Sequence, residues 1–184
     1  MEDLLKELDI QLKTLRLDYY THLKAPLTDA EINVLEKQYN MELPNDVKLL
    51  YKWKNGQYDN CYESFVNNSM FVTLQNSLYT AEDSTSMIGY DFEIENWWNE
   101  HWIPLFHNGA GDLICYDAGG CFTGNKGQII EFWHADNDRN VIAPDLKTFI
   151  ASIYNRTQIE EFDRYFAVES PKGYPLKFIV NKPL

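Results

Sequence analysis

The stretch LTDAEINVLEKQYNMELPNDVKLLYKWKNG, residues 27–56, carries the clearest folding signals in this chain of 184 residues. Thr28 and Glu31 have the spacing of a capping box, in which each side chain accepts a hydrogen bond from the other residue's backbone amide. Pro44 interrupts the apolar pattern and suits the first turn of a further helix. The pair Asn55–Gly56 is typical of a left-handed helix stop. The stretch therefore predicts two successive helices.

The apolar pattern changes on either side of this stretch. Before it, apolar residues from Leu4 to Leu23 recur every three or four positions, which predicts one long amphipathic helix that Pro26 ends. After it, short runs of alternating or continuous apolar residues predict strands, two of them joined as a hairpin by the turn-rich segment 118–127. The predicted strands cover residues 70–74, 102–106, 112–117, 128–134 and 176–180. Two further helices are predicted, one that starts near Pro144 and a short one at residues 159–166.

This order of elements predicts one α+β domain with N-terminal helices, a central antiparallel or mixed sheet and a closing C-terminal helix. Hydrophobic residues make up 45% of the chain and charged residues 24%, as in soluble globular proteins. The first residues lack the basic and apolar regions of a signal peptide, and no apolar run is long enough to cross a bilayer. We therefore expect a cytoplasmic protein that does not bind membranes.

Motifs for metals, cofactors and nucleophilic catalysis are incomplete in this sequence. The three cysteines form no CxxC pair, and the four histidines are scattered. The segment His134–Asn140 begins like a calcium loop, but Val141 and Lys147 stand where glycine and glutamate are required. Gly109 and Gly111 lack the third glycine of a dinucleotide-binding loop. We expect no cofactor, no metal and no catalytic residue.

Negative charge is concentrated in the middle of the chain. Residues 55–125 contain no lysine or arginine, whereas the two flanks together hold 16 bases and 18 acids. Such a surface would repel nucleic acids and attract a basic protein. The ten acids of this segment are Asp59, Glu63, Glu82, Asp83, Asp91, Glu93, Glu95, Glu100, Asp112 and Asp117.

The run DFEIENWWNEHW, residues 91–102, combines four of these acids with three tryptophans and allows three interpretations. Glu93 and Glu95 could form a carboxylate pair beside aromatic platforms for a sugar. The run could be a docking face with aromatic anchors and acids that steer a basic partner. It could also be an ordinary loop whose tryptophans enter the core. The candidate partner-binding residues are Tyr58, Asp59, Tyr62, Glu63, Asp91, Glu93, Glu95, Trp97, Trp98 and Glu100.

Several segments resemble, in the same order, the motifs of the SUKH superfamily, also called the Smi/Knr cell-wall-regulator family. The helix, Leu-Pro-x-Asp turn, helix and Asn-Gly of residues 27–56 match its first signature. WIPLFHNGAGDLICYD (residues 102–117) is similar to its strand pair, and GQIIEFWHAD (127–136) with IAPDLKTFIASI (142–153) to its next strand and closing helix. The resemblance divides the chain into a helical extension (1–26), a family-like core (27–153) and a C-terminal extension (154–184), with an insertion around Ile88–Trp98.

The resemblance implies an α+β fold without catalytic residues, and for bacterial members an immunity protein that neutralises a co-encoded toxin, often a nuclease. Eukaryotic members of the family are similar to regulatory binding modules. Most of the motif residues have evident folding roles. The motif residues are Glu36, Leu43, Pro44, Asp46, Asn55, Gly56, Trp102, Pro104, Gly111, Asp112 and Asp117.

The favoured hypothesis is a non-enzymatic immunity protein that binds a basic toxin domain through an acidic, aromatic-containing surface. The alternative is a regulatory scaffold that binds a cellular enzyme. The third interpretation, a carbohydrate-binding or glycoside-hydrolysing protein, requires a second carboxylate that faces Glu93 or Glu95 across a cleft.

Overall fold

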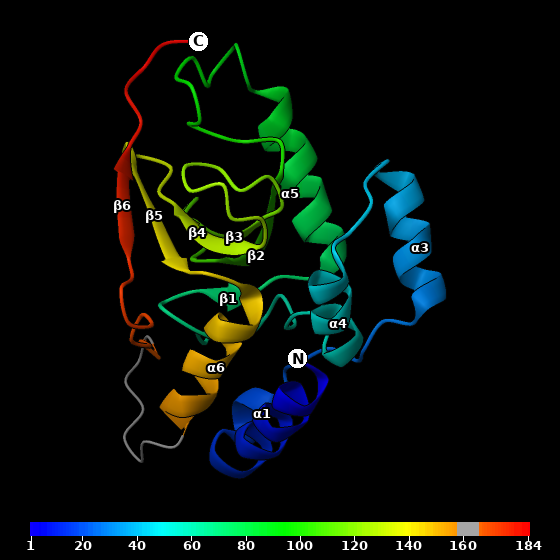
Figure 1. Ribbon diagram of the computed structural model, residues 1–184. Coiled ribbons are helices and arrows are strands. Elements are labelled where there is room, and N and C mark those ends of the chain that lie inside the picture. The colour runs from blue at the N-terminus through cyan, green and yellow to red at the C-terminus, as the bar shows by residue number, and fades with distance from the viewer. Residues whose placement is uncertain (158–165) are drawn as a thin grey trace.

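The computed structural model describes residues 1–157 and 166–184. Helices dominate the first half of the chain and strands the second half (Figure 1). In chain order the elements are α1 (Glu2–Leu15), α2 (Leu17–Tyr20), α3 (Asp29–Gln38), α4 (Asn45–Trp53), β1 (Met70–Phe71), α5 (Leu74–Ser86), β2 (Trp102–His107), β3 (Leu113–Asp117), β4 (Gln128–Phe132), β5 (Asp138–Ala143), α6 (Leu146–Thr157) and β6 (Leu176–Ile179).

The strands form one six-stranded sheet in the order β1-β2-β3-β4-β5-β6, and each pair of neighbours is antiparallel. The α+β class, the N-terminal helices and the closing C-terminal helix are thereby confirmed. The extensions on both sides of the family-like core pack onto it. Helix α1 lies against α6, and β6 pairs with β5.

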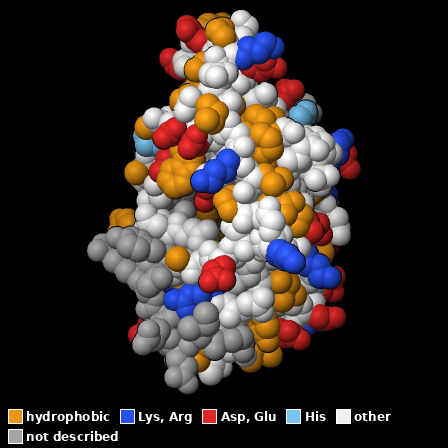
Figure 2. Space-filling model, turned by 60° about the vertical axis from the view of Figure 1, so that its left-hand side comes forward, with side chains coloured by type: hydrophobic (Ala, Val, Ile, Leu, Met, Phe, Trp, Pro, Cys, Tyr) orange, Lys and Arg blue, Asp and Glu red, His pale blue; other side chains and the backbone are white. Residues whose placement is uncertain are grey.

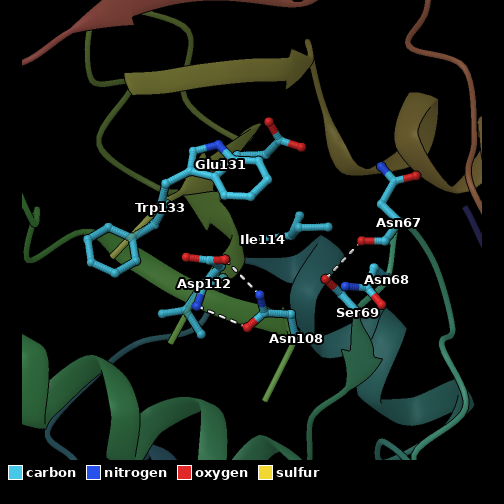
Figure 3. Close-up of a pocket in the computed structure, with 10 residues that line it drawn as sticks. Asn67, Asn68, Ser69, Asn108, Asp112, Ile114, Glu131 and Trp133 are labelled. Atoms are coloured by element: carbon cyan, nitrogen blue, oxygen red, sulfur yellow. Dashed lines mark hydrogen bonds between the residues drawn. The ribbon is translucent and has the colours of Figure 1, made fainter. Parts of the chain in front are cut away.

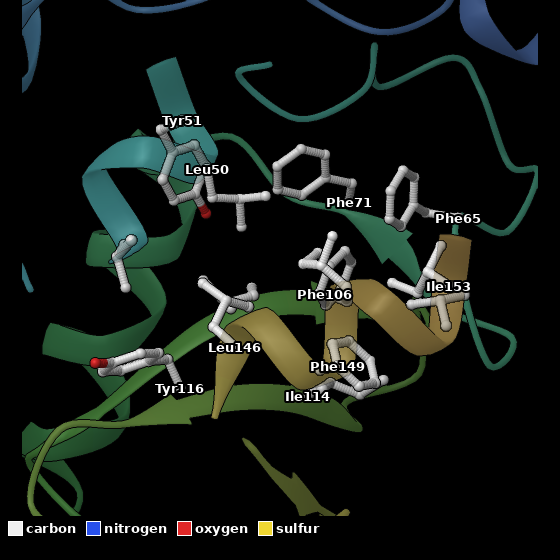
Figure 4. Packing of buried hydrophobic residues seen from close by; sticks show 14 of the residues in the cluster. Leu50, Tyr51, Phe65, Phe71, Phe106, Ile114, Tyr116, Leu146, Phe149 and Ile153 are labelled. Atoms are coloured by element: carbon white, nitrogen blue, oxygen red, sulfur yellow. The ribbon is translucent and has the colours of Figure 1, made fainter. Parts of the chain in front are cut away.

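The first core lies between one face of the sheet and helices α1, α4 and α6, which lie together below the sheet in Figure 1. Its centre is aromatic: the rings of Phe65, Phe71 and Phe106 have centroids 5.3–5.4 Å apart. Phe149 of α6 contacts this group, with its ring centroid 6.0 Å from that of Phe106 (Figure 4). Close packing of large rings explains why the helices hold a fixed position on this face.

The second face of the sheet carries a smaller core of its own. Trp102, Cys115, Ile130, Phe132 and Val141 point to this side, because side chains alternate between the two faces along a strand. They are covered by Ala81 of α5 and by the insertion Ile88–Trp98, which crosses above the sheet in Figure 1. Both faces of the sheet are therefore buried.

Three elements differ from the sequence prediction. The predicted long first helix is interrupted at Arg16, whose φ of −136° and ψ of 52° separate α1 from α2. The predicted strand 70–74 ends at Phe71, and Leu74 begins helix α5, which was not predicted. Strand β5 was also not predicted, because its first residues lie in a run rich in Asp and Asn. The helix predicted at 159–166 falls almost entirely outside the described residues.

Helix α5 has signals that the sequence analysis overlooked. The Thr73 hydroxyl accepts a hydrogen bond from the Asn76 amide at 3.2 Å, as an N-cap does. Leu74, Leu78 and Ala81 are buried at helical spacing, but Ser77 completes the buried face and weakens the apolar pattern.

Candidate protein-binding surface

The structure divides the predicted contact residues into two groups at opposite edges of the sheet. At one edge, the Gln57 amide donates to the carbonyl of Phe71 in β1, so the segment Tyr58–Glu63 follows the β1 edge. At the other edge, Ile94 pairs with Pro183, four residues beyond the end of β6. The two groups are therefore not brought together into one patch.

In the segment Asp91–Glu100, the tryptophans belong to the second core rather than to the surface. The Trp98 side chain is 3% exposed, and its indole nitrogen donates to the Thr85 hydroxyl at 3.1 Å. Its ring meets Trp102 and Phe132 edge-on, with centroids 5.5 and 5.2 Å away. Trp98 therefore offers almost no surface to a partner, because its ring is packed on the apolar sheet face and removed from water.

Trp97 is partly buried because an arginine lies against it. The guanidinium of Arg139, itself fully buried in β5, lies 4.9 Å from the Trp97 ring centroid and 4.7 Å from that of Phe132. Arg139 also donates to the carbonyls of Trp97 (2.8 Å) and Asp136 (2.8 Å). Burial lowers the Arg139 pKa to about 10, so the side chain stays charged at neutral pH. Arg139 therefore links the insertion, through the Trp97 carbonyl, to the β4–β5 turn, through the Asp136 carbonyl.

Lys182 of the C-terminal tail neutralises one of the predicted acids. Its Nζ lies 2.7 Å from the Glu95 carboxylate, and the Glu95 amide donates to the Lys182 carbonyl. Glu95 thus faces a cation where a retaining or inverting glycosidase would need a second carboxylate. Asp91, Glu93 and Glu100 stay exposed.

The other group of acids is also partly paired with bases from the flanks. The Glu63 carboxylate lies 2.6 Å from Arg16, and Asp59 lies 3.9 Å from the Lys24 ammonium. On the face shown in Figure 2, acidic and basic side chains lie next to each other in several places, including the upper tip. The charge segregation along the sequence is therefore reduced in the folded protein.

The aromatic residues beside β1 point outward. Tyr58 is 49% exposed and Tyr62 is 82% exposed. Together with Asp59, Met70, His107 and Asn108 they line a groove of about 450 Å³, which we call the tyrosine groove. Burial lowers the pKa of His107, which favours the neutral form of its imidazole. Exposed tyrosines beside an open groove are typical of protein contact surfaces.

A second, smaller pocket lies next to the tyrosine groove, and Asn108 lines both. This pocket encloses about 70 Å³, and we call it the Glu131 pocket. In Figure 3, Glu131 and Trp133 lie across the opening from Asn67 and Ser69, with Asp112 and Asn108 below. It combines carboxylate, amide and indole groups at the ends of β2 and β4.

The two carboxylates of the Glu131 pocket have different surroundings. Burial raises the pKa of Asp112, but hydrogen bonds from His134 and Asn108 outweigh it and lower the pKa overall. Burial also raises the pKa of Glu131, and its hydrogen bonds with the Asn140 and Trp133 side chains compensate for this only in part. Asp112 is therefore a structural link between two turns, whereas Glu131 is a desolvated carboxylate that lacks a counter-charge.

Trp133 and Glu131 are surface candidates that the sequence analysis missed. Trp133 is 39% exposed, more than any other tryptophan of the chain, all of which lie in the described part. The sequence carries a faint signal for this. Trp133 has the same parity as the polar Glu131 along the strand run, opposite to the buried Ile130 and Phe132.

The comparisons with known proteins identify the family. A sequence model of the SMI1/KNR4 family (SUKH-1) matches residues 26–152, which is more than half of the chain. The chain belongs to the SMI1/KNR4 family (SUKH-1). The resemblance noted from the sequence motifs is thus confirmed. A search of curated proteins finds no match.

In this SUKH-1 chain, the motif residues of the first signature hold the helices together. The Glu36 carboxylate accepts from the Leu43 amide at 2.7 Å and pairs with Lys48 at 2.7 Å. The Asn55 side chain accepts from the Leu74 amide and so caps α5. A Cβ on Gly56 would lie 2.5 Å from the Val72 backbone, which explains the glycine.

The second SUKH-1 signature contains a fully buried carboxylate, Asp117. It accepts from the amides of Gly119, Gly120 and Cys121 at 2.6–3.0 Å and from the Gln128 side chain at 2.8 Å. These bonds shape the β3–β4 loop. Asp117 is thus engaged in the fold, as are Glu36, Asn55 and Asp112.

In the part of the chain that the structure describes, no helix is both long enough and apolar enough to cross a bilayer. Within residues 1–157 and 166–184, no three His, Cys, Asp or Glu side chains are grouped as a metal site would require.

Proposed function

We propose that this protein is a non-enzymatic immunity protein that binds and neutralises a toxin by covering a basic surface of it. Membership of the SUKH-1 family carries the proposal, since the bacterial proteins that the motifs resemble act in this way. The roles of the motif residues support it. Glu36, Asn55, Asp112 and Asp117 are engaged in holding the fold, so these residues are not free for chemistry.

The contact surface in this proposal is the end of the sheet that carries the tyrosine groove and the Glu131 pocket. Tyr58, Tyr62 and Trp133 supply exposed aromatic area, and among the described residues no lysine or arginine lines either cavity. Aromatic residues dominate binding energy at protein interfaces. The exposed carboxylates of Asp91, Glu93 and Glu100 lie outside this surface and act in the proposal through long-range attraction of a basic partner.

Gene context supplies the partner for the test. Where a neighbouring gene encodes a large secreted protein with a variable C-terminal domain, that domain is purified and mixed with this chain at low and high salt. We expect capture that weakens as salt rises, because the attraction between exposed charges is screened. We also expect that cells producing the domain survive when they produce this chain as well.

Absence of a complex at low salt, with toxicity unchanged by this chain, would contradict the proposal. A complex with a cellular enzyme in place of the toxin domain would instead favour the regulatory scaffold.

A further inference from the structure

The Glu131 pocket contains a carboxylate without a cation. Within the described residues, no lysine, arginine or histidine lies within ion-pair distance of Glu131, whereas Glu36, Glu63 and Glu95 each have one. A carboxylate can accept about four hydrogen bonds. Asn140 supplies one at 3.1 Å and the Trp133 side chain interacts as a second donor, so acceptor capacity is left over for a cation. Removal of a carboxylate from water without a counter-charge is costly, so a cation that enters the pocket gains more there than at an exposed acid.

The size of the pocket limits what can enter. Its volume of about 70 Å³ is far below the roughly 300–1,000 Å³ of cavities that hold whole small-molecule ligands. A guanidinium or ammonium group is small enough to fit, but a sugar ring or nucleotide is not. The pocket therefore suits the tip of a side chain that a larger partner presents.

The walls of the pocket suit such a tip. The Trp133 ring lies beside Glu131, so a cation at the carboxylate would pass along the indole (Figure 3). Arginine and lysine both gain from contact with an aromatic ring, through the charge and through the aliphatic stem. The amide oxygens of Asn108 and Asn67 are already used within the fold, since Asn108 Oδ1 accepts from the Asp112 and Ala110 amides and Asn67 Oδ1 from the Val168 amide. Glu131 is therefore the principal acceptor for a cation in this pocket.

The adjoining tyrosine groove gives the rest of the partner a place to lie. Asn108 lines both cavities, so the two lie next to each other and one partner can contact both. The groove is a weaker cation site than the pocket. Its acid, Asp59, is 84% exposed in its side chain and already lies near Lys24.

We propose that the Glu131 pocket binds an arginine or lysine side chain of the partner protein, with Glu131 as its counter-charge and Trp133 against its stem. The neighbouring residues of the partner lie on Tyr58 and Tyr62 in the tyrosine groove. The identity of the protein that supplies the cation rests on the proposed function, but the chemistry of the pocket does not.

Nuclear magnetic resonance of the intact chain tests the pocket directly. N-acetyl-arginine methylamide is titrated into the protein, and the indole N–H resonance of Trp133 is followed after assignment with Trp133→Phe. N-acetyl-citrulline methylamide is the matched control, because it has nearly the same shape without the charge. We expect the arginine compound to shift the Trp133 resonance and the citrulline compound to leave it in place.

Variants then identify the counter-charge. Glu131→Gln keeps the shape of the side chain and should weaken the arginine compound about tenfold, the usual scale for loss of a charge-assisted hydrogen bond. Glu93→Gln removes an exposed acid elsewhere and should change nothing. Thermal unfolding of both variants shows that they are folded, and the two-compound comparison on the unchanged protein needs no variant.

Equal shifts with both compounds, no shift at Trp133, or an unchanged response in Glu131→Gln would each overturn the inference. If any of these results is obtained while the chain still neutralises its toxin domain, the proposed function stands and the binding site lies elsewhere. If the chain binds the arginine compound as expected but neutralises no toxin, the inference about the pocket stands and the proposed function is contradicted.

Discussion

The segments Asp91–Glu100 and Tyr58–Glu63 have similar compositions, but their aromatic side chains differ in exposure to solvent. Both combine acids with aromatic residues and contain no base. In the first, Trp98 is buried and Trp97 is covered by Arg139, whereas in the second, Tyr58 and Tyr62 face solvent. The first segment crosses an apolar sheet face that α5, alone among the helices of the described part, covers. The second follows the edge of β1, whose neighbouring faces α4 and α6 already fill.

This difference teaches that the surface opposite a loop decides which of its side chains are exposed. A tryptophan removes roughly 150–250 Å² from water when buried, so an uncovered apolar face attracts it strongly. The acids of both segments remain at the surface, but their nearest bases come from distant parts of the chain, Arg16, Lys24 and Lys182.

The largest expected effect separates the two segments by stability. Trp98→Ala should lower the free energy of unfolding by about 3–5 kcal/mol, because it leaves a cavity against Trp102 and Phe132. Tyr62→Ala should change it by no more than about 0.5 kcal/mol, as at other exposed positions. Denaturant titration measures both. A loss below about 1 kcal/mol for Trp98→Ala would show that the insertion does not form part of the core.

The next effect separates the segments by binding. Tyr62→Ala should weaken the toxin complex by about 2 kcal/mol if Tyr62 is an interface anchor. Tyr90→Ala is a matched control, since Tyr90 is 79% exposed and directly precedes Asp91. Calorimetry with the toxin domain compares the two variants. A greater loss with Tyr90→Ala would move the contact surface to the insertion.

The titration of Glu131 gives a smaller effect that depends on pH. Burial raises the pKa of this carboxyl above its usual value, so the folded protein binds the proton more tightly than the unfolded chain. The stability that Glu131 contributes is therefore fully present below the unfolded pKa and is lost as the pH rises through the folded pKa. Relative to the unchanged protein, Glu131→Gln should gain stability between pH 4 and pH 7. Denaturant titrations at both pH values measure this difference. A loss of stability of Glu131→Gln relative to the unchanged protein between these pH values would contradict the raised pKa of Glu131.

The smallest expected effect concerns the ion pair at the C-terminal tail. Glu95→Gln should cost less than about 1 kcal/mol of folding stability, because its partner Lys182 is 76% exposed in its side chain. The same change should shift the salt dependence of toxin binding little, since Glu95 is already neutralised. A large loss of toxin binding in Glu95→Gln would show that the insertion is part of the contact surface.

The sequence by itself determined the features that depend on near neighbours. The capping box forms as predicted, with the Thr28 amide 2.8 Å from the Glu31 carboxylate and the Glu31 amide 3.3 Å from the Thr28 hydroxyl. The β3–β4 hairpin and its long loop also follow from local apolar runs and turn residues. Motif order was sufficient for the SUKH-1 family, because such motifs record local turns and caps.

Only the tertiary structure decided which side chains reach the surface. Strand β5 escaped prediction because it begins in a run rich in Asp and Asn and includes Arg139. A buried arginine is stable only where distant carbonyls such as that of Trp97 accept its hydrogen bonds. Trp98 and Trp133 look alike in sequence, yet one faces a sheet and the other faces an opening. Burial depends on which segments meet across the fold, and that information is not local.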